Sequence, residues 1–225
     1  MYQYIFFDLD GTLTDPREGI TKSVQYALAK MGIQEADLTK LEVFIGPPLV
    51  DSFMEYYGFT LEEARQGTEY YRENFSVRGW RQNKLFDGVK EMLTDLKAHG
   101  RVTAIASSKP EYFVEKILAY FEIDGLFDYV CGGSMDESRT RKDQVIEELL
   151  KRMNLSGSEK KKILMVGDRR HDVEGAAVFG IPCLGLSMGF AAEGELIQAG
   201  AAAVVDSVEG ITEYILKGAG SYEME

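Results

Sequence analysis

The sequence contains little cysteine and fewer positively than negatively charged residues, and both shortages narrow the classes of protein to which it can belong. Only two of its 225 residues are cysteines, Cys131 and Cys183, which lie in apolar stretches and outside any spacing typical of a metal site. We therefore expect buried thiols in a reducing compartment and no disulfide framework. Lysine and arginine number 25 against 37 aspartates and glutamates, and this net charge of −12 argues against nucleic-acid binding.

Long apolar runs are also missing. The N-terminal run MYQYIFFDLDG contains aspartates, and no run reaches the roughly 18 apolar residues that a membrane span needs. The sequence therefore predicts neither a secretory signal nor a membrane span, and the cytosol is the expected location. A composition of 45% hydrophobic and 28% charged residues is typical of a folded globular protein, with one large domain or a main domain and an insert.

Short β-rich runs alternate with helical stretches after about residue 86, a pattern typical of a parallel sheet flanked by helices. We therefore predict a doubly wound, Rossmann-like α/β core, with apolar runs that suit strands buried on both faces. Strands are expected at 4–8, 102–107, 127–131, 163–167 and 182–185, with a weaker one at 203–205. One crossover helix should begin after an N-cap at Asp87 and end at Gly100, and another should follow Lys142.

Residues 16–85 break this alternation, because their apolar residues recur with a helical period and form no convincing strand. Thr60 and Glu63 are spaced as a capping box for a helix that ends near Phe75. We predict that residues 1–15 and 86–225 form the core and that residues 16–85 form an inserted helical cap. The cap contains the loop Gly46-Pro47-Pro48, which is either a plain turn between helices or a segment that faces a substrate.

Two aspartates, Asp8 and Asp10, follow the first expected strand in the motif FFDLDGT. Parallel sheets bind ligands at the carboxyl ends of their strands, which makes this pair a candidate site. Two carboxylates about 4 Å apart repel by about 4 kcal/mol at an effective dielectric of about 20, so the pair needs a compensating charge. Oxygen ligands favour Mg²⁺ over zinc, and the pair therefore points to a magnesium site. A plain Asp-Gly turn is the alternative.

A second acidic pair, Asp168 and Asp172, follows the fourth long strand, with a helix expected to begin near His171. One helical turn separates the two residues, so both carboxylates can face one point. Taken alone, they could be helix N-terminal acids stabilised by the macrodipole, by about 0.3 to 1 kcal/mol each. Together with Asp8 and Asp10 they predict four carboxylates at neighbouring strand ends, for which a bound cation is the better explanation.

Hydroxyl and cationic groups follow other strands. Ser107, Ser108 and Lys109 come at the end of the strand expected from residue 102, where a hydroxyl and the N–H groups of the next helix can cradle an anion. Lys142 stands just before a helix, with a solvated lysine as the plain alternative. Carboxylates, a hydroxyl and a cation at successive strand–helix junctions are the groups that phosphoryl transfer requires.

These motifs resemble those of the haloacid dehalogenase superfamily, and within it the phosphoglycolate-phosphatase-like branch with a helical, C1-type cap. The resemblance spans essentially the whole chain: FFDLDGTLTD matches the first motif, AIASSKP the second, Lys142 the third and VGDRRHDVEGAAVFGIP the fourth. Ser107 stands where threonine is common in the family, which keeps the hydroxyl. Order along the chain, rather than a strong local pattern, assigns Ser107 and Lys142 to their motifs.

The resemblance implies a Mg²⁺-dependent phosphatase that acts on a small-molecule phosphate ester. Asp8 would be the nucleophile that forms an aspartyl-phosphate, and Asp10 would act as general acid and then as general base. Mg²⁺ would be held by Asp8, Asp168 and the backbone carbonyl of Asp10, with Asp172 orienting this shell from behind.

The resemblance also assigns the phosphoryl oxygens to Lys142 and Ser107, beside Ser108 and Lys109. Lys109 is a second cation near the site, so either lysine could be the main phosphate-binding one. The cap would close on hinges near residues 14–17 and 80–86, exclude water, and present the loop Gly46-Pro47-Pro48 to the leaving group.

Several substrates stay open, because the cap decides the leaving group. Phosphoglycolate is the family default, and a nucleoside monophosphate is the alternative if cap aromatic residues stack on a base rather than pack in a core. These aromatic residues are Phe44, Phe53, Tyr56 and Tyr57. Among enzymes, a sugar phosphomutase is the closest alternative to a phosphatase. A non-catalytic phospho-accepting or binding protein is a remote alternative. Asp10 argues against dehalogenation, because a halide leaving group needs no acid. A monomer and a homodimer are both compatible with the sequence.

Overall fold

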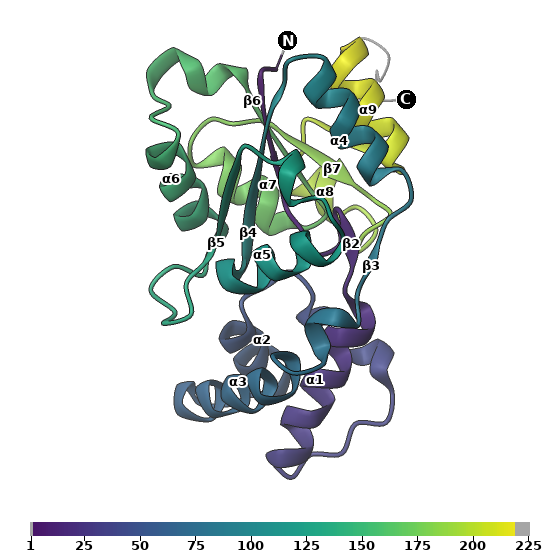
Figure 1. Cartoon of the computed structure of the whole chain (residues 1–225). Helices are drawn as coiled ribbons and strands as arrows, with labels where there is room; N and C mark the ends of the chain where they lie inside the picture. The colour runs from purple at the N-terminus through teal and green to yellow at the C-terminus, as the bar shows by residue number, and fades with distance from the viewer. Residues whose placement is uncertain (1, 219–225) are drawn as a thin grey trace.

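The computed structural model describes residues 2–218 and contains a six-stranded sheet with helices on both faces (Figure 1). The strand order is β5-β4-β1-β6-β7-β8, and every neighbouring pair is parallel. The strands are β1 (Tyr4–Phe7), β4 (Val102–Pro110), β5 (Tyr129–Gly133), β6 (Ile163–Gly167), β7 (Cys183–Leu186) and β8 (Ala203–Val205). The predicted α/β core is therefore confirmed.

Two strands, β6 and β8, have the predicted bounds, and the other strands differ at their ends. β1 ends one residue early, at Phe7, and β7 is displaced by one residue toward the C-terminus. β4 continues to Pro110, because after a register shift Pro110 pairs with Gly133 of β5. β5 begins at Tyr129 rather than at Phe127, since the N–H of Phe127 closes the preceding 3-10 turn η3 (Asp124–Leu126).

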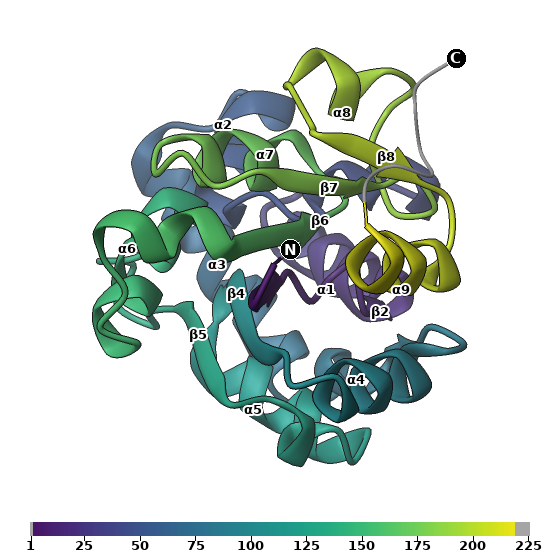
Figure 2. The same cartoon turned by 90° about the horizontal axis from the view of Figure 1, so that it is seen from above.

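Alternate strand residues contribute to two apolar clusters, one on each face of the sheet (Figure 2). Ile5 and Phe7 of β1 lie in the cluster that α4, α5 and α9 cover, whereas Phe6 lies in the cluster beneath α6, α7 and α8. These helices are α4 (Val89–Ala98), α5 (Glu111–Tyr120), α6 (Lys142–Arg152), α7 (Arg170–Ala177), α8 (Glu195–Gln198) and α9 (Val208–Lys217). A 3-10 turn, η4 (Gly157–Lys162), precedes β6.

The N-cap predicted for α4 is wrong, because Gly88 rather than Asp87 occupies that position and no side chain caps the helix. Gly88 has a φ of +83°, in the left-handed region that favours glycine, so backbone geometry starts this helix. The helix ends at Ala98, close to the predicted end at Gly100. The starts of α6 and α7 agree with the sequence prediction.

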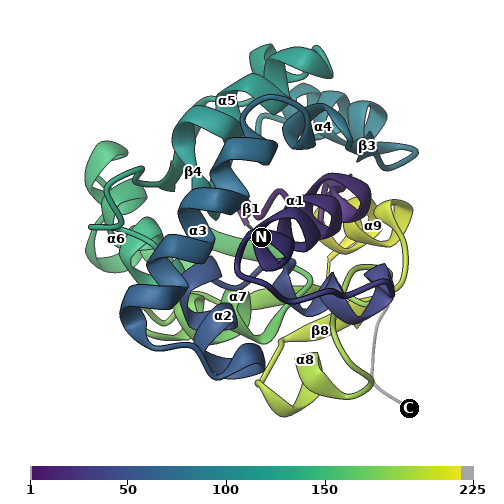
Figure 3. The same cartoon turned by 90° about the horizontal axis from the view of Figure 1, so that it is seen from below.

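Helices between residues 17 and 81 gather at the carboxyl end of the sheet, where Figures 1 and 3 show α1, α2 and α3 together. They are α1 (Arg17–Lys30), η1 (Leu38–Phe44), α2 (Leu49–Tyr57), α3 (Leu61–Phe75) and η2 (Gly79–Arg81). The capping box predicted for α3 is present, with the Glu63 N–H donating to Thr60 Oγ1 at 3.3 Å and the Thr60 N–H donating to Glu63 at 2.8 Å.

A short strand, β3 (Lys84–Leu85), lies where the sequence indicated none. It pairs antiparallel with β2 (Thr14–Asp15), so the two connections between the sheet and the helices at its end run side by side. A pair of two-residue strands has too few residues to show a period of two, which is why the sequence gives no sign of it.

Both cysteines are buried and free, in β5 and β7. Burial raises the pKa of the Cys131 thiol to about 11, so this thiol stays protonated at neutral pH. Among residues 2–218, no helix combines the length and the apolar character required to cross a membrane.

Candidate active site

Two acidic residues lie at adjacent strand tips. Asp8 directly follows β1 and Asp168 directly follows β6, and these strands pair in register with Phe7 opposite Val166. Asp172 lies in the first turn of α7. One carboxylate oxygen from each of the three aspartates lies within 4.8 Å of the others, and all three side chains are buried. The structure therefore brings together three of the four predicted carboxylates.

Glycines leave the space that these carboxylates occupy. A Cβ atom at Gly11 or Gly189 would collide with the side chain of Asp168, and one at Gly167 would collide with Asp172. Gly11 also has a φ of +87°, a conformation that L side chains rarely adopt. The glycine of the motif DLDGT is thus required both for its backbone angle and for the close approach of the two acidic strand ends.

Lys142 is buried among the acids at the start of α6. Its Nζ lies 2.9 Å from Asp8 Oδ1 and 2.7 Å from Asp172 Oδ1, and it donates to the carbonyl of Ala106 at 2.7 Å. Burial alone would lower the pKa of Lys142, but the charges of Asp172 and Asp8 outweigh burial and raise the pKa. Lys142 is therefore a cation at neutral pH, in direct contact with Asp8.

Asp10 lies apart from the three clustered carboxylates and pairs with Lys109, whose Nζ is 2.6 Å from Asp10 Oδ2. This Nζ also lies 4.5 Å from the ring centroid of Phe75, at the end of α3. Burial raises the pKa of Asp10, with a smaller contribution from Asp8, although Lys109 acts in the opposite direction. The two predicted lysines therefore contact different acids: Lys142 contacts Asp8, and Lys109 contacts Asp10.

The acidic cluster carries more negative charge than Lys142 balances. Burial, followed by the charges of Asp172 and Asp8, raises the pKa of Asp168 well above its usual value, and burial with Asp8 raises the pKa of Asp172 to about 6. Asp8 Oδ1 and Asp172 Oδ1 accept no hydrogen bond of good geometry, although both lie within ion-pair distance of Lys142. Buried oxygens of this kind, in surplus over cations, fit a divalent cation such as Mg²⁺.

Asp168 is held by two partners that the sequence reasoning missed. Thr12 Oγ1 donates to Asp168 Oδ1 at 3.1 Å, and the Phe190 N–H donates to Asp168 Oδ2 at 2.8 Å. Thr12 lies in the first motif, so its proximity to Asp168 could have been inferred from the prediction that both acidic pairs lie at neighbouring strand ends. Phe190 follows β7 in a loop without any motif, and the sequence contains no signal for it.

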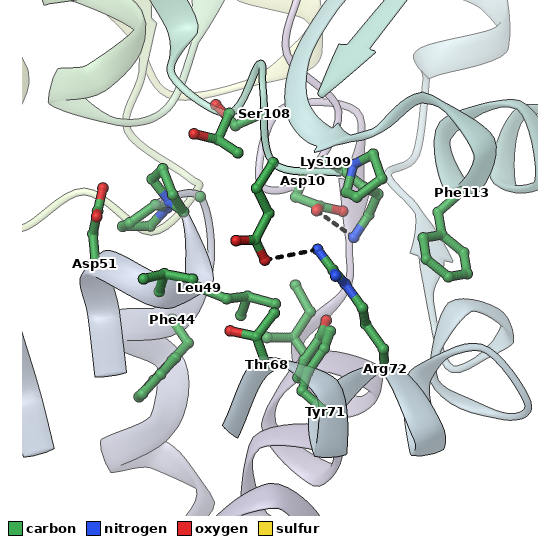
Figure 4. A pocket seen from close by; sticks show the side chains of 18 of the residues that line it. Asp10, Phe44, Leu49, Asp51, Thr68, Tyr71, Arg72, Ser108, Lys109 and Phe113 are labelled. Atoms are coloured by element: carbon green, nitrogen blue, oxygen red, sulfur yellow. Dashed lines mark hydrogen bonds and ion pairs between the residues drawn. The ribbon is translucent and has the colours of Figure 1, made fainter. Parts of the chain in front are cut away.

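A cavity of about 250 Å³ opens from the acids toward the helices at the end of the sheet (Figure 4). Ser107, Ser108 and Lys109 of β4 line it. The loop Gly46-Pro47-Pro48 lines it as well, which favours the substrate-facing interpretation over a plain turn. Its other lining residues include Phe44, Leu49, Asp51, Arg65, Thr68, Tyr71, Arg72, Phe75, Phe113 and Glu137.

The four aromatic residues Phe44, Phe53, Tyr56 and Tyr57 do not form one stacking surface along the cavity. Phe44 lines the cavity, but Phe53 is fully buried and packs edge-on against Phe44 with ring centroids 4.9 Å apart. Tyr56 and Tyr57 are not among the lining residues, and Tyr56 is 43% exposed. Packing within the helical layer therefore accounts for Phe53, and Phe44 shares the aromatic wall of the cavity with Tyr71, Phe75 and Phe113.

Arg169 connects the acidic strand end to the cavity loop. Its Nη1 donates to the carbonyl of Ile45 at 2.8 Å, and its Nε pairs with Glu195 at 3.0 Å. Gly46 packs against its side chain, where an added Cβ would lie 3.0 Å from Arg169 Cγ. The residue next to Asp168 therefore holds the Gly46-Pro47-Pro48 loop against the sheet end.

The family of the chain follows from comparison with known proteins. A model of the haloacid dehalogenase-like hydrolases matches residues 5–186. The chain belongs to the haloacid dehalogenase-like hydrolase family. A predicted phosphatase from Clostridium acetobutylicum has a crystal structure that superposes with a TM-score of 0.93 at 42% identity, covering 96% of this chain and 99% of that one.

Curated relatives in this family carry several names. A 5'-nucleotidase of Pseudomonas aeruginosa is 47% identical over 195 residues, which is 87% of each chain. The tyrosine-protein kinase PtkA of Mycobacterium tuberculosis is 38% identical over 190 residues, 84% of this chain and 63% of PtkA. A phosphoglycolate phosphatase of Photorhabdus laumondii is 30% identical over 194 residues, 83% of this chain and 80% of the relative. The present protein is an enzyme of this hydrolase family, a phosphatase of phosphoric monoesters.

Proposed function

We propose that this phosphatase hydrolyses a small-molecule phosphate monoester through an aspartyl-phosphate on Asp8, with Mg²⁺ as cofactor. The observation that carries the proposal is the position of Asp8, buried beside the Lys142 cation and lining the cavity. Asp8 would attack phosphorus, and the bond between phosphorus and the leaving oxygen would break. Lys142 and Ser107, with Ser108 beside them, would bind the phosphoryl oxygens.

Asp10 would supply the proton to the leaving oxygen and then take a proton from the water that cleaves the aspartyl-phosphate. This second step restores Asp8 and releases inorganic phosphate. The raised pKa of Asp10 supports the first role, because the residue must carry a proton when the ester enters. Lys109, which pairs with Asp10, would keep its carboxyl group in position for both transfers.

Mg²⁺ would be held by Asp8, Asp168 and the backbone carbonyl of Asp10. Asp172 would act from behind, since it pairs with Lys142 and accepts the Arg169 N–H at 3.0 Å. The bound cation would supply the positive charge that offsets the carboxylates and the phosphoryl oxygens. The raised pKa values of Asp168 and Asp172 support this assignment, because they reflect burial first and then the charges of neighbouring carboxylates, both of which a bound cation would offset.

Residues 16–85 would act as a cap that closes over the cavity on the two connections near residues 14–17 and 80–86. The contact of Arg169 with the Ile45 carbonyl supports a closed position, in which the Gly46-Pro47-Pro48 loop meets the leaving group. Closure would exclude water from Asp8 until the leaving group departs. The cytosolic location stays a prediction, which rests on the lack of a predicted secretory signal or membrane span, and the two free, buried cysteines are compatible with it.

For the leaving group, the apolar cavity wall favours a nucleoside, and the substrate would be a nucleoside 5'-monophosphate. Leu49, Tyr71, Phe75 and Phe113 line the cavity with apolar side chains against which a base could pack, and the 47% identical 5'-nucleotidase supports the same choice. Phosphoglycolate, the substrate that the sequence favoured, is the second candidate. It is supported by the relatives named phosphoglycolate phosphatase.

The test is phosphate release from nucleoside monophosphates, phosphoglycolate, sugar phosphates and p-nitrophenyl phosphate, with and without Mg²⁺. Asp8→Asn should abolish release, because the amide cannot attack phosphorus, while the folded protein keeps its circular dichroism spectrum. Full turnover in Asp8→Asn would refute the aspartyl-phosphate mechanism. Phosphate that migrates within a sugar phosphate without release would refute the phosphatase assignment in favour of a mutase.

A further inference from the structure

Positively charged side chains in the cavity are all paired with carboxylates. Three of the cavity-lining residues in the described chain carry positive charge, namely Arg65, Arg72 and Lys109. Lys109 pairs with Asp10, as described above. Arg72 Nη2 lies 3.3 Å from Glu137 Oε1, and Arg65 Nε lies 3.9 Å from Glu137 Oε2. A single carboxylate, that of Glu137, therefore pairs with both arginines.

The pair of arginines faces the part of the cavity that receives the leaving group. Arg65 and Arg72 are two turns apart on α3, and Figure 4 shows the Arg72 side chain directed into the cavity beside Lys109. Tyr71, the neighbour of Arg72, lies close enough to Asp10 for the charge of Asp10 to contribute to the raised pKa of Tyr71, behind the larger effect of burial. Arg65 and Arg72 line the same cavity as Asp10, the residue that would protonate the leaving oxygen.

Glu137 reaches this position from the loop after β5, whose internal hydrogen bonds hold its shape. The Ser134 N–H donates to the Arg139 carbonyl at 2.8 Å, and the Arg139 N–H donates to Ser134 Oγ at 2.9 Å. The Ser138 N–H and hydroxyl both donate to Asp136 Oδ1, at 3.1 and 2.7 Å. Glu137 itself has a φ of +64° at the tip of this loop, which directs it across to α3.

We propose that Glu137 is a specificity-determining residue that rejects substrates with an anionic leaving group. The proposal rests on the proposed function and concerns the choice between its two candidate substrates. Two free arginines would bind the carboxylate of phosphoglycolate through charge-assisted hydrogen bonds. With Glu137 in place, that carboxylate meets arginines that are already paired and a like charge. A neutral nucleoside has no charge for Glu137 to repel, so its binding is not weakened. Repulsion by the like charge of Glu137, in addition to attraction elsewhere in the cavity, would thus set the preference for a nucleoside monophosphate over phosphoglycolate.

The decisive variant is Glu137→Gln, which keeps the side-chain shape and removes the charge. The ratio of kcat/KM for phosphoglycolate to kcat/KM for a nucleoside monophosphate should rise by about tenfold, mainly through a lower KM for phosphoglycolate, because a partly exposed ion pair is involved. Glu69→Gln is the matched control, since it removes the same charge from an exposed position of α3 outside the cavity, and its ratio should not change. Adding Arg72→Met to Glu137→Gln should remove the gain.

Each outcome bears on a distinct claim. An unchanged ratio in a Glu137→Gln protein that still releases phosphate would overturn the role of Glu137 and leave the phosphatase proposal intact. A wild-type enzyme that prefers phosphoglycolate to every nucleoside monophosphate would also overturn it. Absence of phosphate release from all esters by the wild-type enzyme would instead overturn the proposed function, and the inference with it.

Discussion

Replacement of Lys142 by methionine should destabilise the protein strongly at neutral pH in the absence of metal. The side chain is buried, and its Nζ contacts Asp8, Asp172 and the Ala106 carbonyl at 2.7–2.9 Å. Methionine has a similar length, so that the loss is mainly one of charge and hydrogen bonds. Removing one partner of a buried ion pair costs about 3–5 kcal/mol, because the remaining charge is left uncompensated.

The assay is urea unfolding in a chelating buffer at pH 8 and at pH 5. For a chain of this size the loss should lower the urea midpoint by about 1 to 2.5 M at pH 8. The pKa of Asp172 is about 6 in the folded protein, above the usual 3.8, so the folded state takes up a proton as the pH falls through 6 and gains stability relative to the unfolded chain. Without Lys142 this pKa rises further, and the deficit of the variant should therefore be smaller at pH 5.

The control is Lys90→Met, because the Lys90 side chain is 46% exposed and its Nζ lies as far as 3.9 Å from the carboxylate of Glu122. This change should alter stability by no more than about 0.5 kcal/mol. A Lys142→Met midpoint within about 0.3 M of the wild type at pH 8, or a deficit that grows at pH 5, would show that the Lys142 charge does not stabilise the buried carboxylates. Mg²⁺ should stabilise the variant more than the wild type, since the site then carries one more uncompensated negative charge.

Two further substitutions test the acid and the loop contact. Asp10→Asn should lower kcat by about 100-fold or more for an alkyl phosphate but less for p-nitrophenyl phosphate, because the p-nitrophenolate leaving group needs no proton. Equal losses of kcat on both esters in steady-state assays would contradict the role of Asp10 as acid. Arg169→Gln removes the hydrogen bond to the Ile45 carbonyl. We expect KM to rise several-fold with a smaller change in kcat, and the free energy of unfolding measured in urea to fall by about 1–3 kcal/mol. An unchanged KM would show that Arg169 does not position the loop.

Local patterns in the sequence were enough to predict that Asp8, Asp168 and Asp172 come together. Asp8 and Asp168 each follow a short, continuous apolar run, and in a parallel sheet such runs end at one edge. This local rule needs no knowledge of distant contacts, and for the same reason the bounds of β6 and β8 and the capping box of α3 were predicted correctly. Local patterns failed where no side chain carries the signal, as at the N-cap Gly88 and in the two-residue strand β3.

Which residues meet across the cavity depends on how distant elements pack in the folded chain. Lys142 and Lys109 looked equivalent in the sequence, and packing assigns one to Asp8 and the other to Asp10. Glu137 and Arg72 are separated by 65 positions, and Arg169 and the Ile45 carbonyl by 124. A helical or strand period reports which face of an element is apolar, but not which distant segment covers it, since that depends on how the elements pack together. The acidic residues and lysines of the candidate site could therefore be predicted from the sequence, whereas their partners could not, because the packing of distant elements creates these contacts.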